Sequence, residues 1–176
     1  MPSNQFWHGV GKLVGDVLRA LSASSVQTVK PRTVKGAPGT SGYVGDYEGL
    51  PVIEYTPHSS SSPDPGEIAW GWVPYEEDYS KGKDRPVLII GRDGPWLLGL
   101  PLSSVDHSKD YPQELRAGRY WVPIGKGDWD SQGRSSAVRV DRIVRFQPDG
   151  MRRVAGSLDE KRYQTVAQGL RKHWND

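Results

Sequence analysis

The chain has 176 residues, a length typical of one domain, and its 23 Lys and Arg against 21 Asp and Glu give a formal net charge of +2. It contains no cysteine, which excludes disulfides, thiolate metal sites and cysteine nucleophiles. The near balance of charge excludes a polybasic nucleic-acid-binding tail, so a basic site would have to come from local clustering.

No stretch approaches the roughly 18 apolar residues that span a membrane. The apolar run near the amino terminus is interrupted by Lys12, Asp16 and Arg19, which is unlike a secretory signal. We therefore expect a cytoplasmic protein that does not associate with a membrane.

Residues 1–65 are rich in Gly, Ser and Pro and form a predicted amino-terminal extension. Apolar residues recur at helical spacing between Phe6 and Leu21, which predicts a helix over about 5–21 that its glycines weaken. Three interpretations stay open: the helix packs on the body or on a second copy, lies on a membrane surface, or is partly disordered. The tract 58–65 is typical of a flexible linker, and residues 66–176 form the predicted folded domain.

Apolar patterns of strand type dominate from residue 66 onward. Ile68, Trp70 and Trp72 alternate with other residues, whereas the 86–90 segment is a continuous apolar run that favours a buried strand. The turn sequence 93–95 joins that run to the next strand, which indicates a hairpin. Five strands are predicted, over residues 67–72, 86–90, 96–102, 120–124 and 137–146.

A helix is predicted at the carboxyl end of the chain. Ser157 and Glu160 have the spacing of a capping box, in which each side chain accepts a hydrogen bond from a free backbone N–H. An apolar stripe then follows at helical spacing, formed by Tyr163, Val166, Ala167, Leu170 and Trp174. Short strands followed by one helix predict a mainly β fold, built as a small, strongly bent antiparallel sheet or barrel.

Metal chemistry is not favoured by the residues present. The four His are scattered and lack the paired spacing of metal ligands. Asp106 and His107 could contact a metal, but no further residue completes a ligand set. We therefore expect no metal and no cofactor.

Two segments carry residue types suited to chemistry. Arg85 follows a basic loop and enters a buried strand, where its guanidinium can present five donors to a phosphate. The alternative is a structural role, in which Arg85 pairs with Asp84 or Glu67 or anchors the loop through carbonyl groups. In the second segment, Ser103 and Ser104 end a strand just before Asp106 and His107; these residues are suited to phosphoryl transfer from an RNA 2′-hydroxyl but are also ordinary turn formers.

These segments carry a family resemblance. Residues 66–70, 85–90, 102–104 and 140–143 match, in order and spacing, the pattern of the PemK/MazF toxins of type II toxin–antitoxin systems. The resemblance covers about Gly66 to Trp174. The stretches 103–110 and 129–134 resemble an actinobacterial branch of that family.

The resemblance implies an SH3-like antiparallel β-barrel with a carboxyl-terminal helix, assembled as a homodimer. It further implies a metal-independent endoribonuclease (an mRNA interferase) that cleaves single-stranded RNA and leaves a 2′,3′-cyclic phosphate. A cognate antitoxin is the expected partner, with operator DNA bound through the antitoxin complex. The family's catalytic arginine corresponds to Arg85, and its catalytic threonine to Ser103.

This sequence departs from the family pattern at three places. Ser103 keeps the hydroxyl of the family's threonine but lacks the methyl that restricts χ1. Arg142 stands where better-known members have an amide side chain, and the long amino-terminal extension is the third departure. The residues themselves, rather than the family pattern, suggest His107 as a candidate for proton transfer.

Single-stranded RNA also requires a binding surface, on which aromatic stacking contributes about 1–3 kcal/mol per base. Lys81, Lys83, Ser104, Tyr79 and Trp129 are the predicted RNA-binding residues. Trp129 is expected to be exposed because its neighbours are loop-like, whereas Trp70, Trp72 and Trp96 on strands are expected in the core.

Two other functions compete with the endoribonuclease. One is a non-catalytic module of the same fold that binds nucleic acid or antitoxin. The other is a protein–protein module whose amino-terminal helix recruits a partner.

Overall fold

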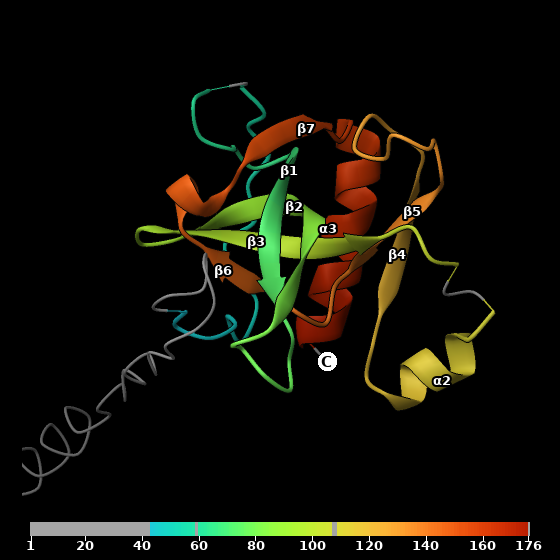
Figure 1. Cartoon of the computed structure of the whole chain (residues 1–176). Helices are drawn as coiled ribbons and strands as arrows, with labels where there is room; N and C mark the ends of the chain where they lie inside the picture. Colours follow the sequence, from blue (N-terminus) through green and yellow to red (C-terminus); the bar gives the residue numbers. More distant parts are fainter. Residues whose placement is uncertain (1–42, 59, 107–108, 176) are drawn as a thin grey trace, which may run out of the picture. The chain divides into compact units, whose positions relative to one another are not determined.

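The computed structural model describes residues 43–58, 60–106 and 109–175. The predicted helix over about 5–21 and the candidate residue His107 lie outside these ranges. Within them, seven strands form one antiparallel sheet that is accompanied by a carboxyl-terminal helix (Figure 1). The described part of the chain holds no helix long and apolar enough to span a membrane.

The strands of the sheet run in the order β4-β5-β3-β2-β1-β7, and β6 also pairs with β3. The end strands β4 and β7 are not paired with each other, so the predicted closure into an SH3-like barrel is not confirmed. The strand bounds are β1 Glu67–Pro74, β2 Gly82–Asp93, β3 Trp96–Ser103, β4 Trp121–Gly125, β5 Ser136–Arg139, β6 Val144–Phe146 and β7 Arg153–Ser157.

The central hairpin confirms the sequence prediction. β2 and β3 pair around a turn in which Gly94 has a φ of 58°, a left-handed conformation that glycine adopts without strain. The apolar run at residues 87–90 is buried on both sides of the sheet, because Leu88 and Ile90 face one core cluster and Val87 and Ile89 face the other. This burial on both faces explains why the apolar residues of the segment are consecutive in sequence rather than alternating with polar ones.

The predicted fifth strand over 137–146 is wrong as one element. It forms β5 and β6, which pair with different parts of β3. The chain leaves the ladder between them, where the Asp141 carboxylate accepts the Tyr120 backbone N–H at 2.7 Å and the Ile143 carbonyl accepts the N–H of Tyr47 at 2.8 Å. Tyr120 and Tyr47 are distant in sequence, so the strand-like pattern of residues 137–146 alone does not predict that the strand is interrupted.

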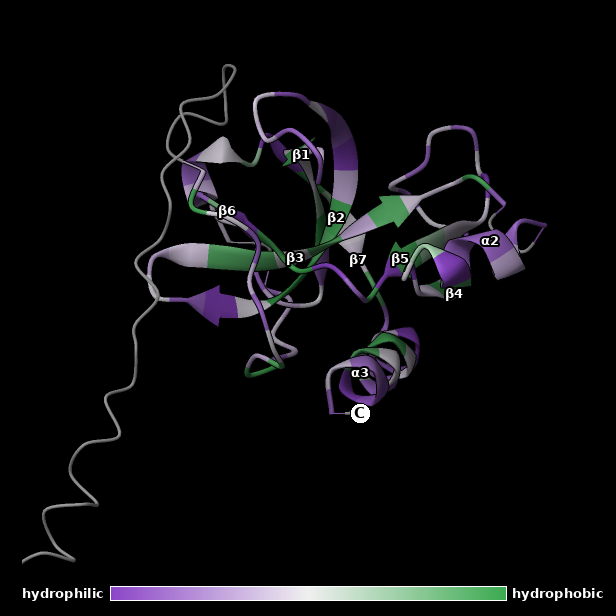
Figure 2. Ribbon diagram, turned by 90° about the horizontal axis from the view of Figure 1, so that it is seen from below, coloured by the Kyte–Doolittle hydropathy of each residue, from purple (hydrophilic) through white to green (hydrophobic). Residues whose placement is uncertain are grey.

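Helix α3 (Glu160–Asn175) packs its apolar stripe on the larger core cluster. Figure 2 shows the helix nearly end-on, with its hydrophobic positions turned toward the sheet. The predicted capping box is not formed: the Asp159 carboxylate, rather than Ser157, accepts a backbone N–H of the first turn, that of Arg162 at 3.0 Å. Two short helical elements were not predicted, α2 at Tyr111–Arg116 and η1 at Pro148–Gly150.

Residues 43–58 pack against the sheet, although the sequence assigns them to the extension. Tyr43 is buried in the smaller core cluster, and Tyr47 forms an isolated bridge with Ile143. The Glu54 N–H donates to the Ile90 carbonyl at 2.9 Å. The expected boundary at residue 65 therefore falls within one packed unit. We call residues 43–58 the strap.

Candidate functional site

The β2–β3 ladder brings Arg85 and Ser103 to one end of the sheet. Val87 of β2 pairs with Pro101 of β3. Arg85 lies two residues before Val87 and Ser103 two residues after Pro101, so in this antiparallel ladder both lie on the same side of that pair. Both residues line a pocket of about 280 Å³, which we call pocket A, and also a neighbouring pocket of about 310 Å³, pocket B. The two residues therefore form part of the wall that the two pockets share.

Arg85 has no ion-pair partner among the described residues. The two carboxylates that a structural role would use are engaged elsewhere: Asp84 pairs with Arg152 at 2.7 Å, and buried Glu67 accepts the Asp64 N–H at 2.9 Å. A half-buried guanidinium without a carboxylate partner favours an anion as its ligand. This arrangement argues against the structural alternative for Arg85.

The surroundings of Arg85 are electropositive. Burial lowers the pKa of the Arg85 guanidinium, Tyr75 raises it, and the charges of Arg139 and Arg142 lower it further, so that it lies below its ordinary value. The group still remains protonated near neutral pH, because arginine starts from a very high pKa. An oxyanion bound beside Arg85 would relieve the repulsion among the three guanidinium groups.

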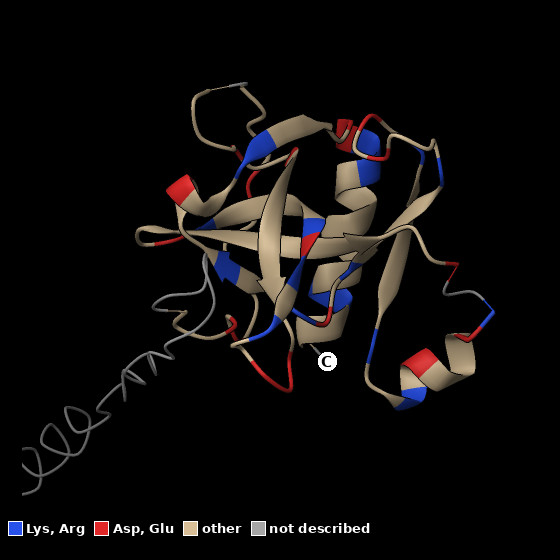
Figure 3. Ribbon diagram, viewed as in Figure 1, with Lys and Arg blue, Asp and Glu red and all other residues tan. Residues whose placement is uncertain are grey.

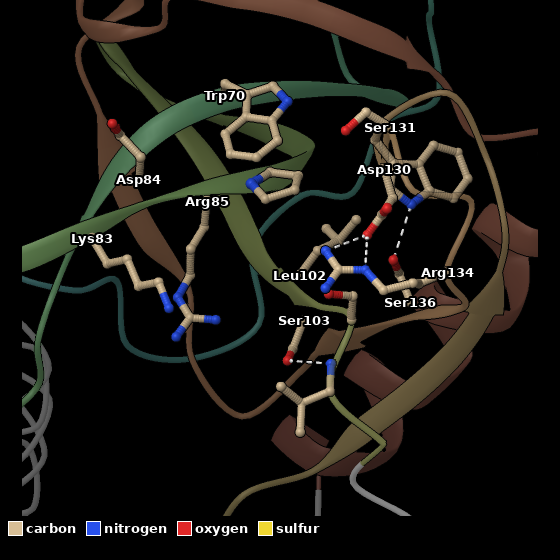
Figure 4. A pocket seen from close by; sticks show the side chains of 14 residues that line it. Trp70, Lys83, Asp84, Arg85, Leu102, Ser103, Asp130, Ser131, Arg134 and Ser136 are labelled. Carbon is tan, nitrogen blue, oxygen red and sulfur yellow. Dashed lines mark hydrogen bonds and ion pairs between the residues drawn. The ribbon is translucent and has the colours of Figure 1, made fainter.

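The Ser103 hydroxyl has a defined orientation. The side chain is 6% exposed, and its Oγ accepts the backbone N–H of Val105 at 3.2 Å (Figure 4). The hydroxyl hydrogen stays available for donation, since the oxygen uses a lone pair for this contact. A backbone contact thus restrains χ1, which in the family's threonine is restricted by the methyl group.

Several of the charged side chains that line pocket B pair with one another or with nearby residues. Arg139 donates to Glu76 at 2.9 Å through both terminal nitrogens and also contacts Asp141 at 2.6 Å. Burial lowers the pKa of Arg139, but its hydrogen bonds to Asp141 and Glu76 outweigh this and hold the pKa above its ordinary value. Buried Arg142 pairs with Asp46 of the strap at 2.6 Å.

Pocket A lies between the ends of β1, β2 and β3 on one side and the β4–β5 loop on the other (Figure 4). The loop wall is fixed by its own contacts. Asp130 accepts Arg134 Nε at 3.0 Å and the Gln132 N–H at 2.8 Å. The Trp129 indole N–H donates to Ser136 Oγ at 3.1 Å.

The predicted RNA-binding residues have different positions. Lys83 lines both pockets, and Ser104 lines pocket A. Lys81 lines neither; it pairs with Asp78 at 3.3 Å on the surface. Tyr79 also lies outside the pockets, because its ring packs edge-on against Tyr43 of the strap at 5.0 Å.

The expected exposure of Trp129 is wrong. The side chain is 3% exposed and belongs to the larger core cluster. Gly127 makes this possible, since a Cβ at that position would lie 2.1 Å from the indole ring. The Arg162 guanidinium lies over the ring, 5.5 Å from its centroid. Trp129 therefore supports the wall of pocket A from within rather than offering an open stacking surface.

Sequence reasoning missed two features of the site. Trp70, Trp72 and Trp96 were expected in the core, but all three are half-buried, and Trp70 lines pocket A. The second feature is Arg139, for which the sequence pattern predicts no role. Its position two residues before Asp141 and next to the family-like segment 140–143 could have indicated one. The link from Arg139 to Glu76 crosses 63 positions and has no signal in the pattern.

No group of three or more His, Asp or Glu in the described part of the chain is arranged to hold a metal ion. Basic and acidic residues are interspersed over the fold rather than segregated (Figure 3). The chemistry that these residues offer is thus the binding of one oxyanion by an unpaired arginine and a hydroxyl donor, between two pockets.

Comparisons with solved structures identify several to which this chain is similar over most of their length. MazF from Deinococcus radiodurans is 15% identical, with 66% of this chain and 100% of that chain covered and a TM-score of 0.48. An endoribonuclease in complex with its cognate antitoxin, from a Mycobacterial species, is 15% identical over 65% of this chain and 96% of that chain, with a TM-score of 0.46. MazF-mt6, a Mycobacterium tuberculosis toxin, is 16% identical over 62% and 96%, with a TM-score of 0.41.

No curated protein matches the sequence. A family model does match, over residues 64–174, which is most of the described chain. That range contains β1 to β7, all of α3 but its last residue, and both candidate residues of the shared wall. The chain belongs to the family of PemK-like and MazF-like toxins of type II toxin–antitoxin systems.

Proposed function

We propose that the protein is a metal-independent endoribonuclease that cleaves single-stranded RNA. The observation that carries the proposal is the unpaired, half-buried guanidinium of Arg85, which lies with the Ser103 hydroxyl between two pockets. A scissile phosphate at this wall would leave the flanking nucleotides to occupy pockets A and B. Single-stranded RNA suits this geometry, because its bases can turn away from one another.

The proposed reaction is an in-line displacement at phosphorus. The RNA 2′-oxygen attacks the adjacent phosphorus and loses its proton, the bond from phosphorus to the 5′-oxygen breaks, and that oxygen takes up a proton. The products are a 2′,3′-cyclic phosphate and a 5′-hydroxyl. Arg85 stabilises the charge that develops on the phosphoryl oxygens, and Ser103 donates a hydrogen bond to the same group.

His107 is the candidate for moving the protons, and it stays a prediction because it lies outside the described residues. Among the described residues that line the two pockets there is no histidine. The second candidate function is a module that binds RNA or antitoxin without cleavage. Replacing His107 with Ala separates the two, since a proton carrier is required for cleavage but not for binding.

The test of the proposal is cleavage of a long single-stranded RNA in the presence of a chelator. Wild type should produce fragments that end in a cyclic phosphate, and Arg85→Ala should lower the cleavage rate at least about 100-fold, the usual effect of removing a transition-state donor. Arg92→Ala is the matched control, because Arg92 is an exposed arginine on the same strand. Full activity of Arg85→Ala would overturn the assignment, and RNA binding without fragments would support the non-catalytic module.

The antitoxin is the proposed protein partner, as the type II family description implies. An acidic segment of that partner would find Arg85 and Lys83 unpaired at the pockets and would exclude RNA from them. A homodimer, operator DNA bound through the antitoxin complex and the actinobacterial branch also remain proposals. Light scattering of the purified protein tests the dimer, and binding of operator DNA with and without antitoxin tests the complex.

A further inference from the structure

The two pockets beside the Arg85–Ser103 wall differ in how their polar groups are engaged. In pocket B, Arg139 and Glu76 pair with each other, Arg142 pairs with Asp46, and Arg119 lies 3.6 Å from Glu114. A base in pocket B could form hydrogen bonds to these groups only by competing with ion pairs. These paired groups of pocket B are therefore poorly suited to reading the identity of a base.

Trp70, which lines pocket A, carries a donor that is not used. The indole Nε1 of Trp70 is buried and has no hydrogen-bond partner among the described residues. Figure 4 shows this nitrogen on the side of the ring that faces Ser131 and Asp130 across the pocket. A buried N–H without an acceptor is unusual in a folded protein and is satisfied when a ligand supplies the acceptor.

The Trp70 ring is held in place on its strand. The residue pairs with Pro86 across the β1–β2 ladder, and the Arg153 guanidinium lies over the ring at 5.7 Å from its centroid. The opposite wall is fixed by the Asp130–Arg134 pair and by buried Trp129. Because both walls are supported by other contacts, the indole N–H has a set direction before any ligand binds.

The carboxylates that line pocket A are already paired. Asp84 contacts Arg152 at 2.7 Å, and Asp130 contacts Arg134 at 2.9 Å. An indole nitrogen donates but does not accept, so the Trp70 N–H matches a carbonyl oxygen and opposes an amino group. Uracil and guanine carry a carbonyl oxygen at the position where cytosine and adenine carry an amino group.

We propose that pocket A receives the nucleobase beside the scissile phosphate and selects uracil or guanine through the Trp70 N–H. The inference rests on the proposed function, since it assigns the base-reading part of the same site. Trp70 is a specificity-determining residue in this scheme, and the chemistry stays with Arg85 and Ser103.

The test compares Trp70→Phe with wild type on a random pool of single-stranded RNA, with the fragment ends sequenced. Wild type should prefer uracil or guanine at one position next to the cut, and Trp70→Phe should reduce that preference about three- to tenfold, as expected for one hydrogen bond. Trp72→Phe is the matched control, because Trp72 has the same unpartnered N–H on the same strand but lines neither pocket. Unchanged preference in Trp70→Phe, or an equal change in Trp72→Phe, would overturn the proposal.

A second measurement does not depend on cleavage or on the stability of a variant. Wild-type protein is incubated with the random pool without turnover, and the bound RNA is sequenced. Paired oligonucleotides that differ at the selected position only by uracil against cytosine, or by guanine against adenine, are then titrated. Tighter binding of the oligonucleotide that carries uracil or guanine supports the proposal even if no RNA is cut, in which case the nuclease assignment alone fails. Equal affinity for the two oligonucleotides contradicts the proposal even if cleavage is specific.

Discussion

Ser103 illustrates how a single hydroxyl can keep its position without the methyl group of threonine. Its oxygen accepts the Val105 N–H, and its Cβ lies in a site that is nearly closed to solvent. The backbone contact uses a lone pair of the oxygen, which leaves the hydroxyl hydrogen available for donation to a ligand. The orientation of the Ser103 oxygen is therefore fixed locally, by the backbone two residues later.

The first prediction concerns this hydroxyl. Ser103→Ala should lower the single-turnover rate of RNA cleavage about 100-fold, because it removes a donor to the developing charge. Ser103→Thr should stay within about threefold of wild type, since it keeps the hydroxyl. Ser157→Ala is the control, an exposed serine at the end of β7. Equal rates for Ser103→Ala and wild type would exclude a role for the hydroxyl in the reaction.

The pattern of residues predicted part of this site and not the rest. Arg85 and Ser103 could be identified because each follows or ends an apolar strand, where the family motif also falls. The Trp70 N–H and the burial of Trp129 could not, because they depend on which atoms meet in space. Trp129 sits among loop-like residues, yet Gly127 leaves room for its ring to turn inward.

At the scale of elements, the loop between β1 and β2 is tied to β5 through one pair. Burial raises the pKa of the Glu76 carboxyl, and the hydrogen bonds and charge of Arg139 lower it more, so that it lies below its ordinary value of 4.5. A carboxyl whose pKa is lower in the folded state contributes stability above its unfolded pKa, and this contribution is lost as pH falls through the folded pKa. The loop should therefore loosen in acid.

Glu76→Gln tests this link. The free energy of unfolding of wild type should fall as pH is lowered from about 5, and that of the variant should fall less. The difference between the two losses should be below about 1 kcal/mol, because the pair is partly exposed. Denaturant titrations at a series of pH values measure the slope. Glu77→Gln changes a neighbouring exposed carboxyl and serves as the control. An identical slope in Glu76→Gln and wild type would contradict the assignment.

The strap has a similar structural role at a larger distance. Asp46 is the carboxylate partner of Arg142, whose side chain is almost fully buried, and the Tyr43 hydroxyl donates to the same carboxylate. A buried arginine needs a counter-ion. The strap supplies it here, so that Asp46 and Arg142 form one structural unit.

Asp46→Asn should consequently destabilise the fold by about 3 kcal/mol, the cost of leaving a buried charge without its partner. The double variant Asp46→Asn with Arg142→Gln should recover much of this loss, since an amide replaces the charge. Thermal unfolding measures both, with Glu48→Gln, an exposed change in the same strap, as the control. If the double variant were less stable than Asp46→Asn alone, the loss of stability in Asp46→Asn could not be attributed to the unpaired charge of Arg142.

Local pattern also explains which elements could be predicted. β1, β2, β3 and α3 carry long apolar periodicities, and the sequence places them within a few residues of their observed bounds. The division of 137–146 into β5 and β6 depends on Tyr47 and Tyr120, and the packing of the strap depends on residues about 40 to 100 positions away. Such contacts produce no hydrophobic periodicity in the segments that make them. The Gly- and Pro-rich sequence of the strap is therefore similar to that of a linker.

At the scale of the whole molecule, a net charge of +2 is small for a protein that binds RNA. Most cations that line the two pockets are paired with carboxylates, including Arg119, Arg134 and Arg139. Arg85 and Lys83 are the two that have no ion-pair partner among the described residues. Binding should therefore depend on few phosphate contacts and on the pockets, rather than on a broad positive surface.

This view predicts a shallow salt dependence. Each neutralised phosphate of a single strand contributes about −0.7 to the slope of log K against log salt, so two free cations give a slope of about −1.4. Lys83→Ala should reduce the slope to about −0.7 and weaken binding of all sequences alike, whereas Lys126→Ala, an exposed lysine away from both pockets, should leave it unchanged. The slope is measured between low and physiological salt by fluorescence anisotropy of a labelled oligonucleotide, with wild type and the two lysine variants, all of which keep Arg85. A slope of about −4 or steeper would mean that the paired arginines release their carboxylates to bind phosphate, and the RNA path would then have to extend well beyond pockets A and B.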